Sequence, residues 1–562
     1  MKNKNLKIIL EENYNEFQFK KNKSNLDITF NRISFIFFIF SLIFIIYSIH
    51  LIHLGSRSKN FKSNNHLISS SNNLNRADIL DRNGNYLSKT VSSIDIGIST
   101  AKIIDKKKLL INLKYIFPNK DYREIKYKME NKNFFYFEKK ISNENYEKIM
   151  RLGDKSIQPE EKLIRIYPDK NLFSHLIGQI DNNNNGISGL EKSLNDLLKD
   201  TLNPIKLTVD KDIQFLIRNE LMKFNKIFET KGSAAVLMNV NNGEILSLIS
   251  LPDFDPNKRK KISDVNFINR VTKGVYEFGS VFKTFTLAAA FDQQIIEPQT
   301  KFFDLPKSIT CAGFQIREYD EKIPTNLTAE QILIRSGNIG SVRIGQKLGV
   351  EKFKSFLTKL GLINKINFDI EEVGKPINFN WGKCPLATAS FGHGITTTLL
   401  QVAKAYSIIV NGGYYIDPTI VKKYKKIKRD QILDKNVSKK IIPILRKIVS
   451  TKEGTANLAN INGYAIGGKT GTANKSIAGS YSNKKVNTFV SIFPTTKPKF
   501  ILAVMLDEPK INSNYIYKYR DGSGFELKGS PRNTAGWNSV EATGHIVEKI
   551  GPILATKYSE VN

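Results

Sequence analysis

A serine and a lysine lie one helical turn apart where an apolar segment begins. In YEFGSVFKTFTLAAAFDQQ, Ser280 and Lys283 are three residues apart, so both side chains would fall on one face of a helix. The small and apolar residues that follow, 284–291, are typical of a buried helix. Burial lowers the pKa of a lysine, and a neutral lysine beside a hydroxyl can turn that serine into a nucleophile. Alone, the pair favours a surface lysine near a helix start, because a serine and a lysine at this spacing occur by chance in most long proteins.

Two further short motifs follow the first in the chain. RSGNIGS contains Ser336 and Asn338, 56 residues after Ser280 (336 − 280). GGKTGTA contains a lysine, a glycine and two threonines: Lys469, Thr470, Gly471 and Thr472. Each motif is weak alone, but their order and context together favour one catalytic site.

The elements around these motifs predict an α+β domain. GSAAVLMNVNNGEILSLISLP reads as two strands joined by a turn at Asn242–Gly243, and NTFVSIFP and FILAVMLDEP read as two more strands. Between them we expect helices after Ser280, near 328–348 and over 399–410. Strands, then helices, then strands indicate an antiparallel sheet flanked by helices.

The N-terminal region carries a membrane-spanning signal. Residues 33–54, ISFIFFIFSLIFIIYSIHLIHL, are long and apolar enough to cross a bilayer. A cleaved signal peptide is the competing interpretation, but the run is long for one, follows a long polar leader and lacks a clear cleavage site. The lysine-rich leader, 1–32, favours a cytoplasmic N-terminus, which would place everything after residue 54 outside the cytoplasm. Residues 55–74 read as a tether, followed by a turn at Asn83–Gly84.

Composition narrows the classes of partner and cofactor. Lysine and arginine total 85 against 53 acidic residues, a formal charge of +32, but these residues are spread evenly and aromatic residues do not interleave with a basic patch. We therefore expect no nucleic acid. With two cysteines, Cys311 and Cys384, six histidines and no ligand spacing, we expect no metal and no cofactor. Whether the two cysteines pair stays open.

The three motifs and several longer segments resemble the class B penicillin-binding proteins, which are peptidoglycan D,D-transpeptidases. The longer segments include RADILDRNG, GLEKSLNDLL, VNNGEILSLISLPDFDPN and GHGITTTLLQVAKAYSIIVNGG. The resemblance implies a cytoplasmic tail (1–32), a transmembrane helix (33–54), a mixed pedestal of the dimerisation type (55–204) and a transpeptidase domain with a serine β-lactamase-like fold (205–562). It also implies a single-pass protein of the inner (plasma) membrane with its catalytic domain in the periplasm.

The resemblance assigns a role to each motif residue. Ser280 attacks the carbonyl between the terminal D-alanines of a stem peptide, and a neighbouring stem peptide's amine resolves the acyl-enzyme. Lys283, with its pKa lowered by burial and by Lys469, acts as the base, Ser336 relays a proton and Asn338 orients Lys283 and a substrate amide. The substrate's carboxylate and backbone are expected at an edge strand that carries Thr470, Gly471 and Thr472. The backbone N–H groups of Ser280 and Thr472 would form the oxyanion hole.

Within the family, Glu277 and Asn338 resemble the septal, cell-division branch, although Phe278 and Gly337 replace a frequent proline and serine. The expected function is crosslinking during septal wall synthesis, with inhibition by β-lactams. The expected partners are the membrane, a polytopic glycosyltransferase and other division proteins. The alternatives are an elongation-type transpeptidase, a D,D-carboxypeptidase, a β-lactamase or β-lactam sensor, and, from a different class, an inactive division scaffold. No role is assigned to His393 or Trp381, and Arg76 and Glu191 are expected to be structural.

Overall fold

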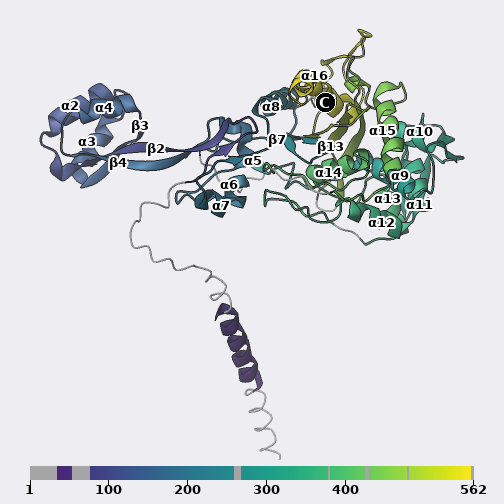
Figure 1. Ribbon diagram of the computed structural model, residues 1–562, viewed down its shortest axis with the longest axis horizontal. Coiled ribbons are helices and arrows are strands. Elements are labelled where there is room, and N and C mark those ends of the chain that lie inside the picture. The colour runs from purple at the N-terminus through teal and green to yellow at the C-terminus, as the bar shows by residue number, and fades with distance from the viewer. Residues whose placement is uncertain are drawn as a thin grey trace, which may run out of the picture. The chain divides into compact units, whose positions relative to one another are not determined.

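The computed structural model describes residues 35–52, 76–258, 267–377, 380–423, 429–477 and 480–558. The chain divides into two compact units, 1–72 and 73–562. In the first, the helix Phe35–Ile52 has 18 residues and a mean hydropathy of 2.6, which is long and apolar enough to span a bilayer (Figure 1). The predicted tail, 1–32, and tether, 55–74, lie outside the described residues.

The second unit begins with a sheet around one long strand. Strand β2 (Tyr86–Ser99) pairs antiparallel with β3 (Phe134–Ile141), β4 (Ile157–Ile166) and β1 (Ile79–Leu80), and β1 pairs parallel with β5 (Ile205–Lys206). As Figure 1 shows, three helices gather beside β3: α2 (Lys106–Ile116), α3 (Tyr122–Asn131) and α4 (Asn143–Met150). They share a small core with the strands, and Asp105, Asp121 and Ser142 cap the three helices.

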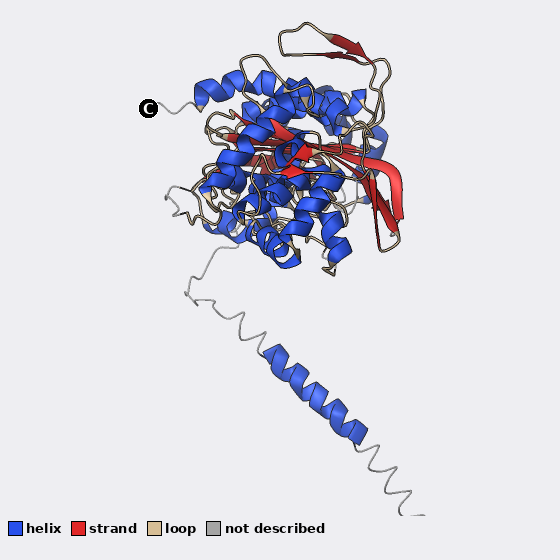
Figure 2. Cartoon of the chain, turned by 90° about the vertical axis from the view of Figure 1, so that its right-hand side faces the viewer, coloured by secondary structure: helices blue, strands red, loops and turns tan. Residues whose placement is uncertain are grey.

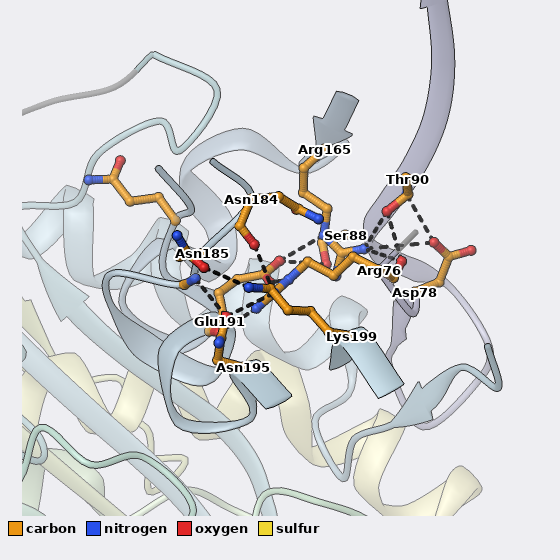
Figure 3. A network of polar contacts seen from close by, with 12 residues as sticks. Arg76, Asp78, Ser88, Thr90, Arg165, Asn184, Asn185, Glu191, Asn195 and Lys199 are labelled. Atoms are coloured by element: carbon orange, nitrogen blue, oxygen red, sulfur yellow. Dashed lines mark hydrogen bonds and ion pairs between the residues drawn. The ribbon is translucent and has the colours of Figure 1, made fainter. Parts of the chain in front are cut away.

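Two arginines share one carboxylate where this sheet meets the short helices α6 (Gly189–Ser193) and α7 (Asn195–Asp200) (Figure 3). Glu191 pairs with Arg76 Nε and, at 2.8 Å, with Arg165 Nε, and all three side chains are buried. Arg76 also donates to the side chain of Asn195 at 3.0 Å, and Ser88 donates to Glu191 at 3.2 Å. The Glu191 carboxylate compensates the charges of the two buried arginines. Because Ser88, Arg165 and Glu191 belong to β2, β4 and α6, the network joins these three elements.

The larger sheet has the strand order β12-β13-β14-β6-β7, and every pair is antiparallel. Its strands are β6 (Gly232–Asn239), β7 (Ile245–Leu251), β12 (Gly467–Ile477), β13 (Ser480–Phe493) and β14 (Phe500–Asp507). Figure 2 shows helices on both faces of this sheet. The first and last helices of this domain, α8 (Lys211–Ile227) and α16 (Ser539–Lys557), pack together against it, as do α14 (Leu399–Val410) and α15 (Lys435–Ser450). The predicted α+β fold is confirmed, and β12 is an edge strand as expected.

Further helices build the layer that carries the first two motifs. They are α9 (Phe282–Asp292), α10 (Ala329–Ile334), α11 (Asn338–Leu348), α12 (Val350–Lys359) and α13 (Lys383–Ala389), with the short α5 (Ser174–Ile177) in the N-terminal part. Helix α9 is buried on every side, as expected for an apolar central helix. The predicted helix at 328–348 is two helices, because Ser336 has a left-handed backbone (φ 58°) that ends the first before Asn338 begins the second.

Three two-stranded sheets complete the described fold. They are β8 (Lys301–Phe302) with β11 (Leu327–Thr328), β9 (Ser308–Cys311) with β10 (Phe314–Arg317), and β15 (Ile516–Lys518) with β16 (Glu526–Lys528). A disulfide joins Cys311 to Cys384, with Cα atoms 5.6 Å apart. It ties the β9–β10 hairpin to α13 and answers the question that the sequence left open.

Candidate active site

Ser280 lies in a single helical turn, Gly279–Val281, directly before α9. It lines a cavity of about 690 Å³, which is also lined by Ser336, Asn338, Thr470 and Thr472. The three motifs, separated by up to about two hundred residues of chain, therefore meet at one hollow.

Lys283 lies one turn after Ser280, and its side chain is 1% exposed. Its Nζ donates to the Ser336 carbonyl at 2.5 Å and to Asn338 Oδ1 at 2.6 Å, and lies 3.2 Å from Ser336 Oγ. Burial is the main cause that lowers the pKa of Lys283, to about 7, while Glu318 acts in the opposite direction. An amine with this pKa is partly neutral at neutral pH and can accept a proton.

The Ser336 hydroxyl lies between two buried lysines. Lys469 Nζ donates to Ser336 Oγ at 2.9 Å and to the Thr470 carbonyl at 3.2 Å. Burial, followed by the charge of Lys283, lowers the pKa of Lys469 well below its ordinary value. Ser336 therefore connects the lysine of the first motif with the lysine of the third, which is the arrangement that a proton relay needs.

The edge strand β12 presents its residues alternately to the interior and to the cavity. Thr470 and Thr472 lie two residues apart, so they share a face and both line the hollow. Their hydroxyls are held in place, since Thr470 Oγ1 bonds Thr455 Oγ1 at 2.7 Å and Thr472 Oγ1 accepts from the Ala535 N–H at 3.0 Å. Among the described strands, β12 pairs with β13 alone, and a sheet edge of this kind can pair with an extended peptide.

Gly471 faces the segment that carries Ser280. A Cβ on Gly471 would lie 2.2 Å from the Phe278 carbonyl oxygen and 2.7 Å from a Val281 methyl. A glycine at this position therefore lets the turn of the serine lie close against β12.

Comparison with known proteins identifies the family. The penicillin binding protein transpeptidase domain matches residues 233–522, and the penicillin-binding protein dimerisation domain matches residues 71–223. The chain belongs to the penicillin-binding protein transpeptidase family. The predicted resemblance to class B penicillin-binding proteins is confirmed. The chain contains both types of domain that the resemblance implied, a dimerisation domain followed by a transpeptidase domain.

Individual relatives extend over most of the chain. A probable peptidoglycan D,D-transpeptidase FtsI of Caulobacter vibrioides is 28% identical over 86% of this chain and 82% of its own length. Stage V sporulation protein D of Bacillus subtilis is 30% identical over 77% of this chain and 74% of its own. The crystal structure of penicillin binding protein 2X from Streptococcus thermophilus shares the fold, with a TM-score of 0.67 at 21% identity over 77% of this chain and 76% of that one.

The structure of this penicillin-binding protein adds residues that its motifs do not reveal. The cavity wall also contains Tyr319 and Asp320 after the β9–β10 hairpin, and Arg532 and Trp537 before α16. Arg532 and Asp320 form an ion pair at 3.3 Å at this wall. These residues lie in loops and in one short helical turn, Ala535–Trp537, without a recognisable motif, so no sequence signal marked them.

His393, to which the sequence assigned no role, also lines the cavity. Its ring packs against Phe391 and Tyr481, and burial, together with the charge of Lys283, lowers its pKa to about 4. His393 is therefore neutral at neutral pH. Tyr481 also donates to the Glu277 carboxylate at 3.1 Å, which joins β13 to the segment before the serine.

Proposed function

We propose that this penicillin-binding protein is a D,D-transpeptidase that crosslinks peptidoglycan stem peptides through an acyl-serine at Ser280. One observation carries the proposal: Lys283 and Lys469, from two motifs far apart in the chain, both contact the Ser336 hydroxyl beside the cavity that Ser280 lines. Several relatives are named peptidoglycan D,D-transpeptidases, which supports the same reaction here.

The reaction begins when Lys283, in its neutral form, takes the proton of the Ser280 hydroxyl. The Ser280 oxygen then bonds to the carbonyl carbon between the two terminal D-alanines, and the developing oxyanion is stabilised by the backbone N–H groups of Ser280 and Thr472. The bond to the last D-alanine breaks, and its nitrogen receives the proton from Lys283 through Ser336. The products of this half-reaction are the acyl-enzyme and free D-alanine.

The second half-reaction reverses the proton path. The amine of a neighbouring stem peptide attacks the acyl carbonyl and its proton passes to Lys283. Lys283 then gives that proton to the Ser280 oxygen, which leaves as the hydroxyl. Asn338 holds Lys283 in place, and before acylation Lys469, Thr470 and Thr472 would bind the terminal carboxylate of the donor peptide, which leaves with the released D-alanine. Gly471 allows the serine turn to lie close against β12.

Three observations support a cellular role: the apolar N-terminal helix, the names of the relatives, and two residues in and beside the motifs. Relatives named FtsI, together with Glu277 and Asn338, support a septal role, with β-lactams as inhibitors. The helix Phe35–Ile52 supports a single-pass anchor, and the basic leader supports a cytoplasmic N-terminus with the pedestal (55–204) and transpeptidase domain (205–562) outside. We propose that the pedestal and membrane helix contact a polytopic glycosyltransferase and other division proteins.

Intact-mass analysis after brief exposure to penicillin tests the nucleophile. The full chain in detergent should gain one drug mass, and Ser280→Ala should gain none. A persistent adduct is expected, whereas rapid loss of the adduct with drug hydrolysis would indicate a β-lactamase. The absence of any adduct would refute the proposal for Ser280.

A second experiment identifies the acceptor. Incubation of the acyl-enzyme formed from a stem pentapeptide with the amine of a second stem peptide should give a crosslinked dimer, and release of the tetrapeptide alone would indicate a carboxypeptidase.

A further inference from the structure

A carboxylate from outside the three motifs caps the helix that begins with Asn338. Glu318 Oε2 accepts from the Asn338 N–H at 2.6 Å, and Oε1 accepts from the Ile339 N–H at 2.9 Å. Gly337, at the N-cap position of α11, has no side chain to offer. Since the first N–H groups of a helix need an acceptor, the cap comes instead from a residue 20 positions earlier (338 − 318).

The same segment also holds the side chain of Asn338. Its Nδ2 donates to the Arg317 carbonyl at 2.7 Å, while its Oδ1 accepts from Lys283 Nζ at 2.6 Å. Residues 317 and 318 therefore fix both the backbone and the amide of Asn338. This orientation directs the amide oxygen, rather than the amide nitrogen, to the lysine.

The β9–β10 hairpin that ends at Arg317 is itself anchored. The Cys311–Cys384 disulfide ties it to α13, and α13 packs against α11. The hairpin and the helix that it caps are thus connected through α13 as well as through Glu318. A support anchored at two points can hold a side chain in a narrow range of positions.

Glu318 also acts on the charge of the site. Its carboxylate stabilises the protonated form of Lys283 and so opposes the effect of burial on the pKa of that lysine. Lys469 and His393 also face Lys283, and both interact electrostatically with it. Tyr319 interacts with Glu318 in turn, and is itself affected by the neighbouring charges of Asp320, Arg335 and Arg532.

We propose that Glu318 is a positioning residue of the acylation reaction, which holds the Ser336–Asn338 turn in register with Lys283 by capping α11. The proposal rests on the roles of Ser280 and Lys283 given above. Glu318 belongs to none of the three motifs, and it is not one of the described residues that line the cavity. Its effect on the reaction is exerted through Asn338 and Lys283.

The test measures the second-order rate constant of acylation by a fluorescent penicillin from pH 5 to 9, with the full chain in detergent. Glu318→Gln keeps the shape but loses the charge and one acceptor oxygen. Glu318→Asp keeps the charge but is shorter. Glu321→Gln, an equal change of charge at an exposed residue three positions on, is the matched control. Thermal unfolding of each variant reports whether it is folded.

For Glu318→Gln we expect a plateau rate about tenfold below that of the unchanged protein, and an acid limb displaced toward lower pH. The limb moves in this direction because loss of the carboxylate lowers the pKa of Lys283, so the neutral base persists at lower pH. Glu321→Gln should leave both unchanged, and Glu318→Asp should lower the plateau without moving the limb. A role in stability alone would lower the rate or the unfolding temperature but would not move the limb.

Two results would overturn the proposal: an unmoved acid limb in Glu318→Gln, or a plateau within twofold of the Glu321→Gln control. If Glu318→Gln does not fold, Glu318→Asp decides, and a plateau equal to that of the unchanged protein overturns the proposal. A failure of the proposed function would look different, because the unchanged protein itself would then acquire no penicillin adduct at Ser280.

Discussion

Gly471 gives the sharpest prediction, because its missing side chain sets the distance between β12 and the turn of Ser280. The Cβ of an alanine at this position would lie 2.2 Å from the Phe278 carbonyl oxygen, whereas ordinary van der Waals contact begins near 3.4 Å. The strand and the turn must therefore separate by about 1.2 Å (3.4 − 2.2) for Gly471→Ala to fit. The obstacle is backbone, so no side-chain rotation can relieve it.

The separation would move the serine relative to the threonines of β12 that would bind the substrate. A misplacement of this size in a catalytic site costs about 100-fold in rate. We expect Gly471→Ala to lower the second-order rate constant of penicillin acylation by about that factor, measured by stopped-flow fluorescence.

Gly337 provides the matched control for this variant. It lies between Ser336 and Asn338, but the Cβ of an alanine there would be 3.5 Å from Glu318 Oε1, at an ordinary distance, and its φ of −64° suits any residue. Gly337→Ala should therefore retain nearly all of the acylation rate. If Gly471→Ala stays within threefold of the unchanged protein, or if Gly337→Ala loses as much, the steric reasoning is refuted.

Three further predictions concern pH and stability. The acylation rate should rise with pH through about 7, because in the proposed mechanism Lys283 must be neutral to accept the Ser280 proton. A rate that is flat from pH 5 to 9 would contradict this. Glu191→Gln should destabilise the fold by about 3–5 kcal/mol, since it leaves two buried arginines uncompensated. A decrease of less than about 1 kcal/mol in the free energy of unfolding, measured by urea denaturation, would count against the network in Figure 3. Replacing Cys311 and Cys384 together by serine should cost about 2–4 kcal/mol, because the disulfide closes a loop of 73 residues; equal thermal unfolding with and without reductant would argue against the bond.

Local spacing made much of the site predictable. Three residues on a helix bring Ser280 and Lys283 to one face in any protein, and two residues on a strand bring Thr470 and Thr472 to one face. The resemblance to the penicillin-binding proteins predicted that β12 is an edge strand, and the observed strand order agrees with this prediction.

Contacts that depend on the tertiary structure could not be predicted in this way. Glu318 lies 18 residues before Ser336 (336 − 318), on no shared helix or strand, so its capping of α11 leaves no periodic signal. The pairing of Cys311 with Cys384 needs the packing of a hairpin on α13, which spacing does not encode. The left-handed backbone of Ser336 likewise interrupts a segment whose composition alone favours one helix.

The two lysines around Ser336 limit the positive charge that the site can hold. Burial lowers the pKa of both, and the charge of Lys283 lowers that of Lys469 further, so the pair resists carrying two protons near neutral pH. In the proposed mechanism the donor's terminal carboxylate arrives beside β12, close to Lys469, and a nearby anion raises the pKa of a lysine. Substrate binding would then favour the proton on Lys469, and that charge in turn favours the neutral form of Lys283. In that mechanism the neutral base would be available for the Ser280 proton when the donor peptide is bound.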